Sequence, residues 1–502
     1  MSGSSATAEG IQFPVRDGRR SSTAATKKIF ARAATPVDPA LAGAIAGAAD
    51  WRKSYVDHVR DVVAAGIATP DRAIRMARAG LDAATSEMVF LRDGDETPLP
   101  AAMDRYDRPA FDTLTIQGKG SPSPGGFRLP YLGDGLDGDA ILRRLDAWEE
   151  RGAIEPSCNE AVRTALADPD WFDLSDLNVV LLGAASEMGP LQSLLSWGAH
   201  VIAVDLPRPE LWARIIGLAL DGPGRLSIPV PQGSSVDVHA AADVAGMDLT
   251  TQTPEVRTWI DGFPGDLVIG NYVYADGANF VRLAVGVDVM LQDLAARRGP
   301  FPLAHLATPT DVYAVPSDIV AGARVGRRSG VRGAFQGAAR NLTARRLYLA
   351  NYGTTLPDDL GRAWGLSDCL VPQQGPNYAL AKNLQRWRAT VSRVDGTTTS
   401  ANLAPATRTR SVMKNRVLAA AYSGAPRFGV EIFQSATSAA LMAALLVHDL
   451  RNPKALAEPS MSLDHPYDLF VHAAAHGGLL RMAHQPRSVL PLAVLLGFVR
   501  TS

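Results

Sequence analysis

The sequence contains little cysteine, no long apolar run and no excess of charge of one sign. Two cysteines in 502 residues are too few for a secreted disulfide scaffold or a cysteine-rich zinc site, so we expect a reducing, cytoplasmic compartment. The longest apolar stretches, 435–447 and 489–499, fall short of the roughly 18 residues that a membrane-spanning helix needs, and we interpret both as core helices. The balance of 50 basic and 51 acidic residues gives no argument for nucleic-acid binding.

The composition is that of a globular protein long enough for several compact units, with 46% hydrophobic and 20% charged residues. Residues 1–37 are basic and rich in Ser, Thr and Ala, and we interpret them as a flexible basic tail. Helical spacing of apolar residues predicts a mainly helical region over 38–172. We place an α/β domain at 173–450 and a C-terminal helical extension at 451–502.

Short apolar runs alternate with helical patterns from residue 177 onwards. Each run is bounded by Gly, Pro or Asp on at least one side, as expected of strands in a parallel sheet that helices cover on both faces. The runs are NVVLLG, HVIAVD, GRLSIPV, GDLVIG and PLAHLAT. They predict a doubly wound parallel sheet.

A glycine-bearing turn follows the first of these strands. Gly183 and Gly189 frame the turn, a helix follows, and the second strand ends at Asp205. This is the Rossmann-type arrangement for a dinucleotide, in which glycines admit the pyrophosphate and the acid binds the ribose hydroxyls. A carboxylate there disfavours a 2′-phosphate, which favours NAD(H), with NADP(H) as the alternative. An S-adenosylmethionine-dependent methyltransferase and a sheet that binds nothing share these features.

The order of the motifs downstream resembles the short-chain dehydrogenase/reductase family. The turn at 183–189 is followed by Asp248-Leu249, by the strand 266–271, by Tyr378-Ala-Leu-Ala-Lys382 and by the segment 402–409. In that family an Asp-hydrophobic pair contacts the adenine, an Asn-rich motif closes the fourth strand, and Y-x-x-x-K carries catalysis. A Pro-Gly motif and a nearby Thr then flank the nicotinamide. The resemblance covers roughly residues 180–430.

The resemblance implies a ketone/alcohol oxidoreductase that works as a homo-oligomer. Tyr378 would be the acid/base, and Lys382 would lower its pKa and hold the nicotinamide ribose. Either Thr308 or Thr310, at the end of the fifth strand, would replace the family's serine, and we favour Thr308 because it lies closer to the strand. The cofactor residues implied are Gly183, Ser186, Met188, Gly189, Asp205, Asp248, Leu249, Asn271, Lys382, Pro405 and Thr409.

Several positions depart from the family pattern. Glu187 replaces the second glycine and would repel a pyrophosphate if its side chain pointed inward. The fourth-strand motif survives only as Gly270-Asn271, the Pro-Gly motif is Pro405-Ala406, and no asparagine of the catalytic tetrad is identified. These departures favour an alternative hypothesis, a Rossmann-type binding or scaffold protein that has lost catalysis.

An arginine-rich insertion, 317–375, separates the fifth strand from Tyr378. It would form a lid that grips an anionic substrate, a patch that rests on acidic lipid, or a solvated pair of basic helices. Its arginines are Arg324, Arg327, Arg328, Arg332, Arg340, Arg345 and Arg346, interleaved with Phe335. Its size suggests a bulky carbonyl substrate, lipid-like or linked as a thioester.

Two histidines near the C-terminus are spaced as metal ligands can be. His472 and His476 lie four residues apart on an expected helix, with Asp468 one turn earlier. Such spacing arises easily by chance, so we interpret them as a structural pair and predict no metal. We expect this segment and 489–499 to form a helical pair that packs on the sheet or on a second subunit.

Overall fold

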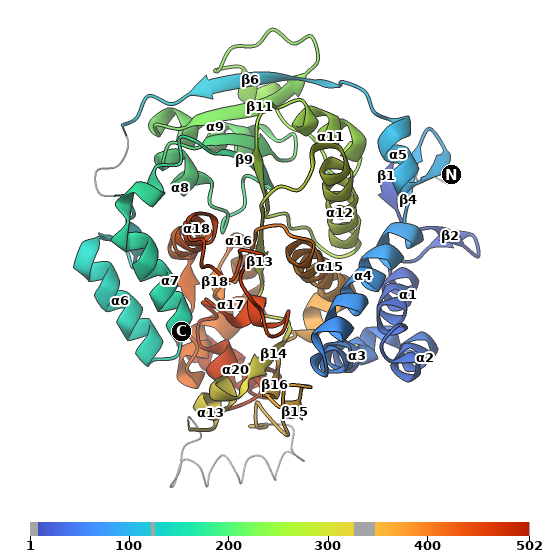
Figure 1. Ribbon diagram of the computed structural model, residues 1–502, viewed down its shortest axis with the longest axis vertical. Coiled ribbons are helices and arrows are strands. Elements are labelled where there is room, and N and C mark those ends of the chain that lie inside the picture. The colour runs from blue at the N-terminus through green and yellow to red at the C-terminus, as the bar shows by residue number, and fades with distance from the viewer. Residues whose placement is uncertain (1–8, 122–125, 326–346, 501–502) are drawn as a thin grey trace.

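The computed structural model describes residues 9–121, 126–325 and 347–500, and the chain forms an α/β structure around one large sheet (Figure 1). The sheet has seven strands, six of them parallel. In spatial order they are β17 (Thr399–Leu403), β13 (Leu303–Ala307), β12 (Leu267–Asn271), β9 (Asn178–Leu182), β10 (His200–Val204), β11 (Arg225–Pro231) and β6 (Phe111–Gln117). The five apolar runs of the sequence are all strands, so the prediction of a parallel sheet is confirmed.

The parallel strands, numbered along the chain, stand in the order 3-2-1-4-5-6. Helices cover both faces of this sheet, as Figure 1 shows. One face carries α8 (Leu191–Ser196), α9 (Pro209–Asp221) and α18 (Ser435–Arg451). The other carries α11 (Thr253–Asp261), α12 (Ala278–Arg298) and α15 (Gly375–Val394). The strand order reverses between β9 and β12, which are parallel neighbours where the two halves of the sheet meet.

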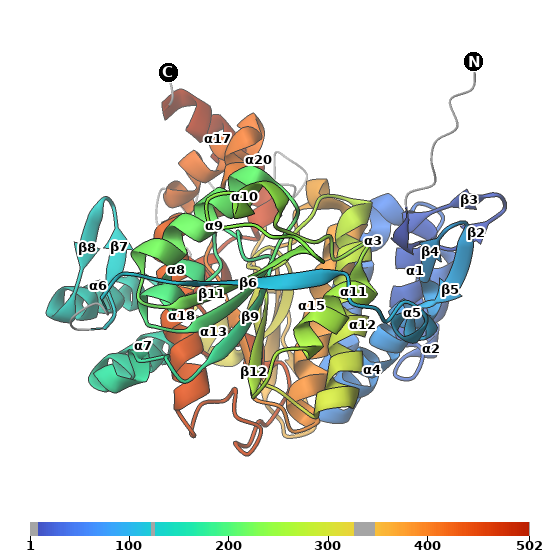
Figure 2. The ribbon, with the colours of Figure 1, turned by 90° about the horizontal axis from the view of Figure 1, so that it is seen from above.

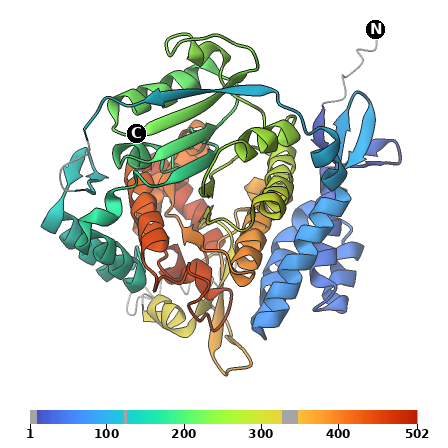
Figure 3. The same ribbon diagram turned by 45° about the horizontal axis from the view of Figure 1, so that its top comes forward.

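The N-terminal region packs as a second layer on α12 and α15, as Figure 3 shows. Its helices are α1 (Ser22–Ala34), α2 (Pro39–Gly47), α3 (Trp51–Ile67), α4 (Pro70–Glu87) and α5 (Leu99–Arg105). Its strands are β1 (Gly10–Gln12), β4 (Val89–Arg92) and β5 (Asp95–Pro98), which form one sheet, and the hairpin β2 (Val15–Arg16) and β3 (Arg19–Arg20).

Two predictions for this region are wrong. Residues 10–37 are not a flexible tail: Ile29 and Phe30 are fully buried, and the Phe30 ring packs edge-on against Trp387 of α15. Nor is the region 38–172 separate from the sheet, because β6 crosses from it and pairs antiparallel with β11 along seven residues. Burial of apolar side chains on α15 therefore fixes a segment whose composition alone favours disorder.

The far side of the sheet carries a smaller helical group, which Figure 1 shows next to α18. It contains the hairpin β7 (Leu129–Tyr131) and β8 (Asp134–Leu136), followed by α6 (Gly138–Glu150) and α7 (Pro156–Ala167). The last two confirm the helices predicted there. Trp148 of α6 is fully buried and packs on Phe433 at a ring separation of 4.8 Å.

The insertion between β13 and α15 forms a small sheet of its own. Strands β14 (Val312–Pro316), β16 (Ala363–Asp368) and β15 (Leu356–Pro357) pair antiparallel, and α13 (Ser317–Val325) follows β14. The Arg324 guanidinium of α13 donates to the carbonyl of Gly353 at 3.2 Å. Arg327, Arg328, Arg332, Phe335, Arg340, Arg345 and Arg346 lie outside the described residues.

The chain beyond β17 builds the remaining elements. Strands β18 (Thr407–Arg408) and β19 (Phe433–Gln434) pair with each other. Helices α16 (Arg410–Lys414) and α17 (Arg416–Gly424) lie between them in the chain. The segment 435–447 lies within α18 and is a core helix, as predicted. The segment 489–499 lies within α20 (Pro486–Arg500), but one side of that helix is exposed, so the prediction of a core helix is wrong there. Among the described residues, no helix has the length and apolar character needed to cross a bilayer.

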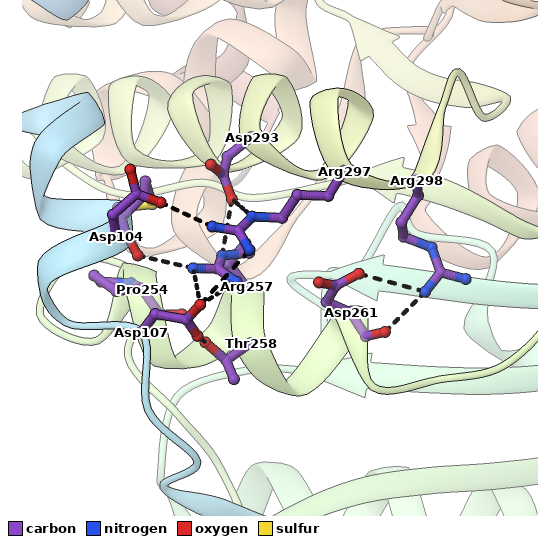
Figure 4. A network of polar contacts seen from close by, with 10 residues as sticks. Asp104, Asp107, Pro254, Arg257, Thr258, Asp261, Asp293, Arg297 and Arg298 are labelled. Carbon is purple, nitrogen blue, oxygen red and sulfur yellow. Dashed lines mark hydrogen bonds and ion pairs between the residues drawn. The ribbon is translucent and has the colours of Figure 1, made fainter.

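A network of charged side chains joins the N-terminal region to the helices on the sheet (Figure 4). Arg257 of α11 is 1% exposed and pairs with Asp293 of α12 at 2.9 Å and with Asp107 at 3.2 Å. It also donates to the carbonyl of Met103 in α5 at 2.8 Å. A buried guanidinium with this many acceptors holds three segments together, because it bonds α12, α5 and the segment after α5 at once.

We expect Arg257→Ala to lower the free energy of unfolding by about 2–3 kcal/mol, because it removes several charge-assisted hydrogen bonds of a buried side chain. Arg105, which pairs with Asp95 and is about half exposed, provides the control. Arg105→Ala should change the free energy by about 1 kcal/mol or less, because exposed pairs contribute little. Urea denaturation of both variants measures the difference, and equal effects would contradict the structural role of Arg257.

Candidate functional site

The carboxyl ends of the parallel strands meet along one edge of the sheet. Asn271 of β12 and Val204 of β10 both pair with Leu182 of β9, and Leu403 of β17 pairs with Ala307 of β13. This register brings the residues that follow the strands to one edge. They are Gly183, Asp205, Tyr272, Thr308 and Pro405. In open α/β sheets, ligands bind at this edge, where the strand order reverses.

The turn after β9 requires glycine at its first position. Gly183 has φ +77°, and a Cβ there would lie 3.0 Å from the carbonyl oxygen of Tyr272. Gly189 donates to the carbonyl of Ser186 and lies against its side chain, which closes the turn. Helix α8 has only six residues and begins at Leu191. In the described part of the chain, the N–H groups of Glu187 and Met188 have no acceptor.

Asp205 lies beside this turn, partly exposed. Its carboxylate accepts hydrogen bonds from the N–H of Ala185 at 2.7 Å and from that of Leu206 at 2.8 Å. Burial raises the pKa of Asp205, and these two hydrogen bonds oppose the shift. An ionised carboxylate accepts up to about four hydrogen bonds, so Asp205 retains capacity for a hydroxyl ligand.

Glu187 points away from the interior of the turn and across to the segment after β18. Its carboxylate pairs with the Arg410 guanidinium at 3.0 Å and accepts the Arg410 backbone N–H at 2.7 Å. Thr409 is the N-cap residue of α16 and lies next to Arg410 in the chain. The residue that departs most from the family turn is therefore a link between the turn and α16, and its charge is paired.

Asp248 and Leu249 lie next to the end of β10, because the N–H of Met247 donates to the carbonyl of Asp205 at 2.9 Å. The Asp248 carboxylate accepts from the N–H and hydroxyl of Thr250, and Leu249 is buried in the core. Asn271 is buried and accepts weakly from the N–H of Val273 at 3.4 Å. Pro405 is also buried, and its carbonyl accepts from the hydroxyl of Thr407.

Tyr378, in the first turn of α15, reaches the end of β13. Its hydroxyl donates to Thr308 Oγ1 at 3.0 Å and lies 3.3 Å from Thr310 Oγ1. The structure thus brings together two predicted catalytic residues that lie 70 positions apart in the chain. Burial raises the pKa of Tyr378, which opposes the lowering that we expected from Lys382. The hydroxyl therefore stays protonated at neutral pH.

Lys382 lies one turn further along α15, on the same face as Tyr378. Its Nζ donates to Gln385 Oε1 at 2.9 Å rather than to Tyr378, and it lies 5.6 Å from the centre of the Phe280 ring. Burial lowers the pKa of Lys382 to about 8, while the carboxylate of Asp311 acts in the opposite direction. Asp311 itself is fully buried and pairs with Arg386 at 3.2 Å.

A cavity of about 10 Å³, enough for one water molecule, lies between α15 and β13. Thr308, Asp311, Lys382 and Gln385 line it, together with His305. His305 is 4% exposed, and neither ring nitrogen has a hydrogen-bond partner within the described part of the chain. Burial lowers the pKa of His305 to about 3, so the ring is neutral.

Sequence analysis did not identify His305 or Gln385. One signal was available for each of them: His305 is the polar exception in an otherwise apolar strand, and Gln385 follows Lys382 at helical spacing. Aromatic side chains surround the Tyr378 hydroxyl as well. Phe280 lies 5.8 Å from the Tyr378 ring and 5.2 Å from that of Tyr274, which is half exposed.

The histidines near the C-terminus do not share a helix. Helix α19 (Asp468–Val471) ends before His472. His476 is fully buried, and its Nε2 bonds the Glu155 carboxylate at 2.8 Å, while its Nδ1 accepts from the N–H of Gly478. Arg481 pairs with the same carboxylate. These contacts fasten the C-terminal segment to the start of α7, and they agree with the structural role that we predicted for His476.

No family model matches this chain, and comparisons with curated proteins and with solved structures find no match.

Proposed function

We propose that this protein is an NAD(P)(H)-dependent oxidoreductase that interconverts a ketone and an alcohol. The observation that carries the proposal is the contact between Tyr378 and Thr308 at the carboxyl edge of the sheet, with Lys382 one turn below. Two hydroxyls and an ammonium group at such an edge can hold a carbonyl oxygen and exchange a proton with it.

The glycine turn supports a dinucleotide at this edge. The strand order 3-2-1-4-5-6 is that of a Rossmann-type sheet, and the turn lies where the order reverses. Gly183 keeps the turn free of a Cβ, the N–H groups of Glu187 and Met188 can donate to phosphate, and the Asp205 carboxylate can accept from ribose hydroxyls. The residues present therefore fit such a cofactor.

Tyr378 would transfer the proton. A carbonyl oxygen beside Thr308 Oγ1 would accept hydrogen bonds from both hydroxyls, and the Tyr378 hydroxyl would give up its proton as negative charge develops on that oxygen. The Lys382 ammonium would stabilise the resulting tyrosinate. The nicotinamide, when bound, supplies or accepts the hydride. The Tyr378 hydroxyl is protonated at neutral pH, as a proton donor in the reductive direction must be.

The choice of cofactor depends on Asp205 and its neighbour Arg208. The carboxylate favours the free 2′-hydroxyl of NAD(H). Arg208 is exposed, three residues further along, and its charge acts on the pKa of Asp205. A guanidinium in that position can also bind the 2′-phosphate of NADP(H), which keeps NADP(H) as the alternative.

A second candidate function is dinucleotide binding without catalysis. It is favoured by the position of Lys382, whose Nζ bonds Gln385, and by the raised pKa of Tyr378. The two candidates share the cofactor and differ only in whether substitutions at Tyr378 change a reaction rate. Methyl transfer from S-adenosylmethionine gives Tyr378 and Lys382 no role.

We expect NADH to bind with a micromolar Kd in a calorimetric titration run in parallel with NADPH and S-adenosylmethionine. Asp205→Asn should weaken NADH binding about tenfold or more, because it removes a charged hydrogen-bond acceptor. Glu210→Gln, an exposed carboxylate on the neighbouring helix α9, is the matched control and should leave the Kd unchanged. Binding of S-adenosylmethionine alone would overturn the proposal.

We expect Tyr378→Phe to reduce the turnover of a carbonyl substrate by about 10²–10⁴-fold while NADH binding stays unchanged. The assay is NADH oxidation across a panel of bulky ketones and thioester-linked carbonyl compounds. Tyr274→Phe removes the hydroxyl of a nearby, half-exposed ring and serves as the control. Equal rates for wild type and Tyr378→Phe on every reduced substrate would assign the proton transfer to another group, and no reduction of any substrate would leave only the binding function.

The pKa of Lys382 predicts the pH dependence of reduction. The ammonium is charged below about pH 8 and loses its proton above it, so kcat/KM for reduction should be constant from neutral pH to about 7.5 and fall above 8. Lys382→Arg keeps a positive charge throughout this range and should remove the fall. A fall of the same size at the same pH in both enzymes would assign the titration to another group.

A further inference from the structure

Helices α17 and α20 are not consecutive in the chain, but they pack against each other. This pair, called the α17–α20 hairpin below, projects from the body of the molecule beside the C-terminus in Figure 2. The two helices pack through small residues. A Cβ on Gly424 would collide with the backbone of Ala493, and a Cβ on Gly497 with that of Ala420. In each helix these small residues lie four positions apart, so the backbones approach closely without large side chains between them.

The large apolar side chains of this hairpin therefore point outward. Leu495 is 62% exposed and Val417 56%, and Leu496, Phe498 and Val499 are exposed as well; Met413 of the adjoining helix α16 is 46% exposed. A surface helix normally buries its large apolar residues and presents polar ones to water. In the α17–α20 hairpin, small residues form the contact between the helices and several large apolar residues face water. An exposed apolar patch of this kind marks a surface that contacts another phase or another molecule.

Basic residues surround the patch, and acidic ones are missing from its two segments. Arg408, Lys414, Arg416 and Arg427 are all exposed. No Asp or Glu occurs between residues 396 and 430 or after residue 468. Arg410 is also exposed and pairs with Glu187, which lies in the glycine turn. The hairpin thus combines an apolar face with positive charge, although the whole chain has a net charge of −1.

We propose that the α17–α20 hairpin binds the surface of a membrane that contains anionic lipids. Leu495, Val417 and their apolar neighbours would enter the boundary between headgroups and acyl chains, while the basic residues would meet the lipid phosphates. The protein lies on the bilayer rather than across it, since no helix among the described residues is suited to span one.

Charge distinguishes this occupant from a second copy of the chain. In a symmetric dimer the same patch would face itself, which would bring Lys414 and Arg416 of one copy toward the same residues of the other. Like charges juxtaposed at an interface are unfavourable. An anionic lipid surface offers the opposite sign at every one of these positions.

The hairpin borders the candidate site. Helix α16, which leads into α17, is tied to the glycine turn by the pair between Arg410 and Glu187. Burial raises the pKa of Tyr422 in α17, and Tyr378 contributes to the same shift. A substrate dissolved in the bilayer would therefore reach the carboxyl edge of the sheet directly. This last step rests on the proposed function, whereas lipid binding by the hairpin does not.

The test is flotation of the full-length protein with two kinds of vesicle, phosphatidylcholine alone and phosphatidylcholine with phosphatidylglycerol. We expect flotation with the anionic vesicles only, decreasing at high salt as the charges are screened. Lys414→Glu with Arg416→Glu should weaken binding about tenfold or more, because each basic residue near the surface contributes to the attraction. Leu495→Glu should weaken it to a similar extent.

Leu360→Glu is the matched control for Leu495→Glu, because Leu360 is 63% exposed but lies away from the hairpin, between Asp358 and Arg362. It should bind vesicles like the wild type, and circular dichroism should show all variants folded. Equal flotation with neutral and anionic vesicles, or with neither, would overturn the proposal. A dimer that Leu495→Glu dissociates, in a protein that floats with no vesicle, would assign the patch to a second copy instead. None of these outcomes depends on nicotinamide binding.

Discussion

Burial of helix α15 on every side is the constraint on which the rest of the structure depends. The sheet lies along one face of α15, α12 beside it, and α1, α3 and α4 against the other. Because no face is left to solvent, its polar residues need partners inside the protein.

Arg386 pairs with Asp311 and donates to the carbonyl of Val312, and Arg388 pairs with Asp288 at 2.6 Å. Lys382 has only the neutral Gln385 and a cavity for one water molecule. Lys382 thus has the weakest polar partners among these charged residues of α15. It is also the one that the family resemblance places in catalysis, as expected where function and stability compete.

Burial shifts the two titratable groups of the candidate site in opposite directions. It disfavours the charged form of each, so it lowers the pKa of Lys382 and raises that of Tyr378. A mechanism that begins with a tyrosinate gains nothing from this environment, whereas one that begins with a protonated tyrosine does. The neutral His305 ring, with no partner within the described chain, leaves a polar but uncharged wall beside Lys382. Burial therefore keeps the Tyr378 hydroxyl protonated at neutral pH but makes it a weaker acid, so proton transfer from it depends on the Lys382 charge and on the charge that develops on the substrate oxygen.

The central strands could be predicted from the sequence because each is a continuous apolar run bounded by turn residues. Strand β6 was missed, although the alternation of polar and apolar residues at its end is typical of a half-buried strand. It lies within a passage rich in Pro and Gly, which favours turns. The helix over residues 22–34 was also not predictable from the sequence. Ile29 and Phe30 are buried among α3, α4 and α15, and the contact of Phe30 with Trp387 joins residues more than 350 positions apart. The pair Tyr378 and Thr308 was predictable from motif order. The role of Gln385 was not, because it depends on the rotamer of Lys382.

Glu187 departs from the family's glycine turn, and its contacts with Arg410 give a structural reason for this departure. A carboxylate in a glycine turn looks unfavourable for an anionic ligand, but its charge is paired with Arg410 and its oxygen also accepts the Arg410 N–H. The same pair fixes the start of α16, and through it the hairpin whose close backbone packing depends on Gly424 and Gly497. Replacing Glu187 by the family glycine would remove this link and leave Arg410 with no carboxylate among the described residues. The residue that departs from the family motif therefore links the turn to the start of α16, the helix that leads into the hairpin.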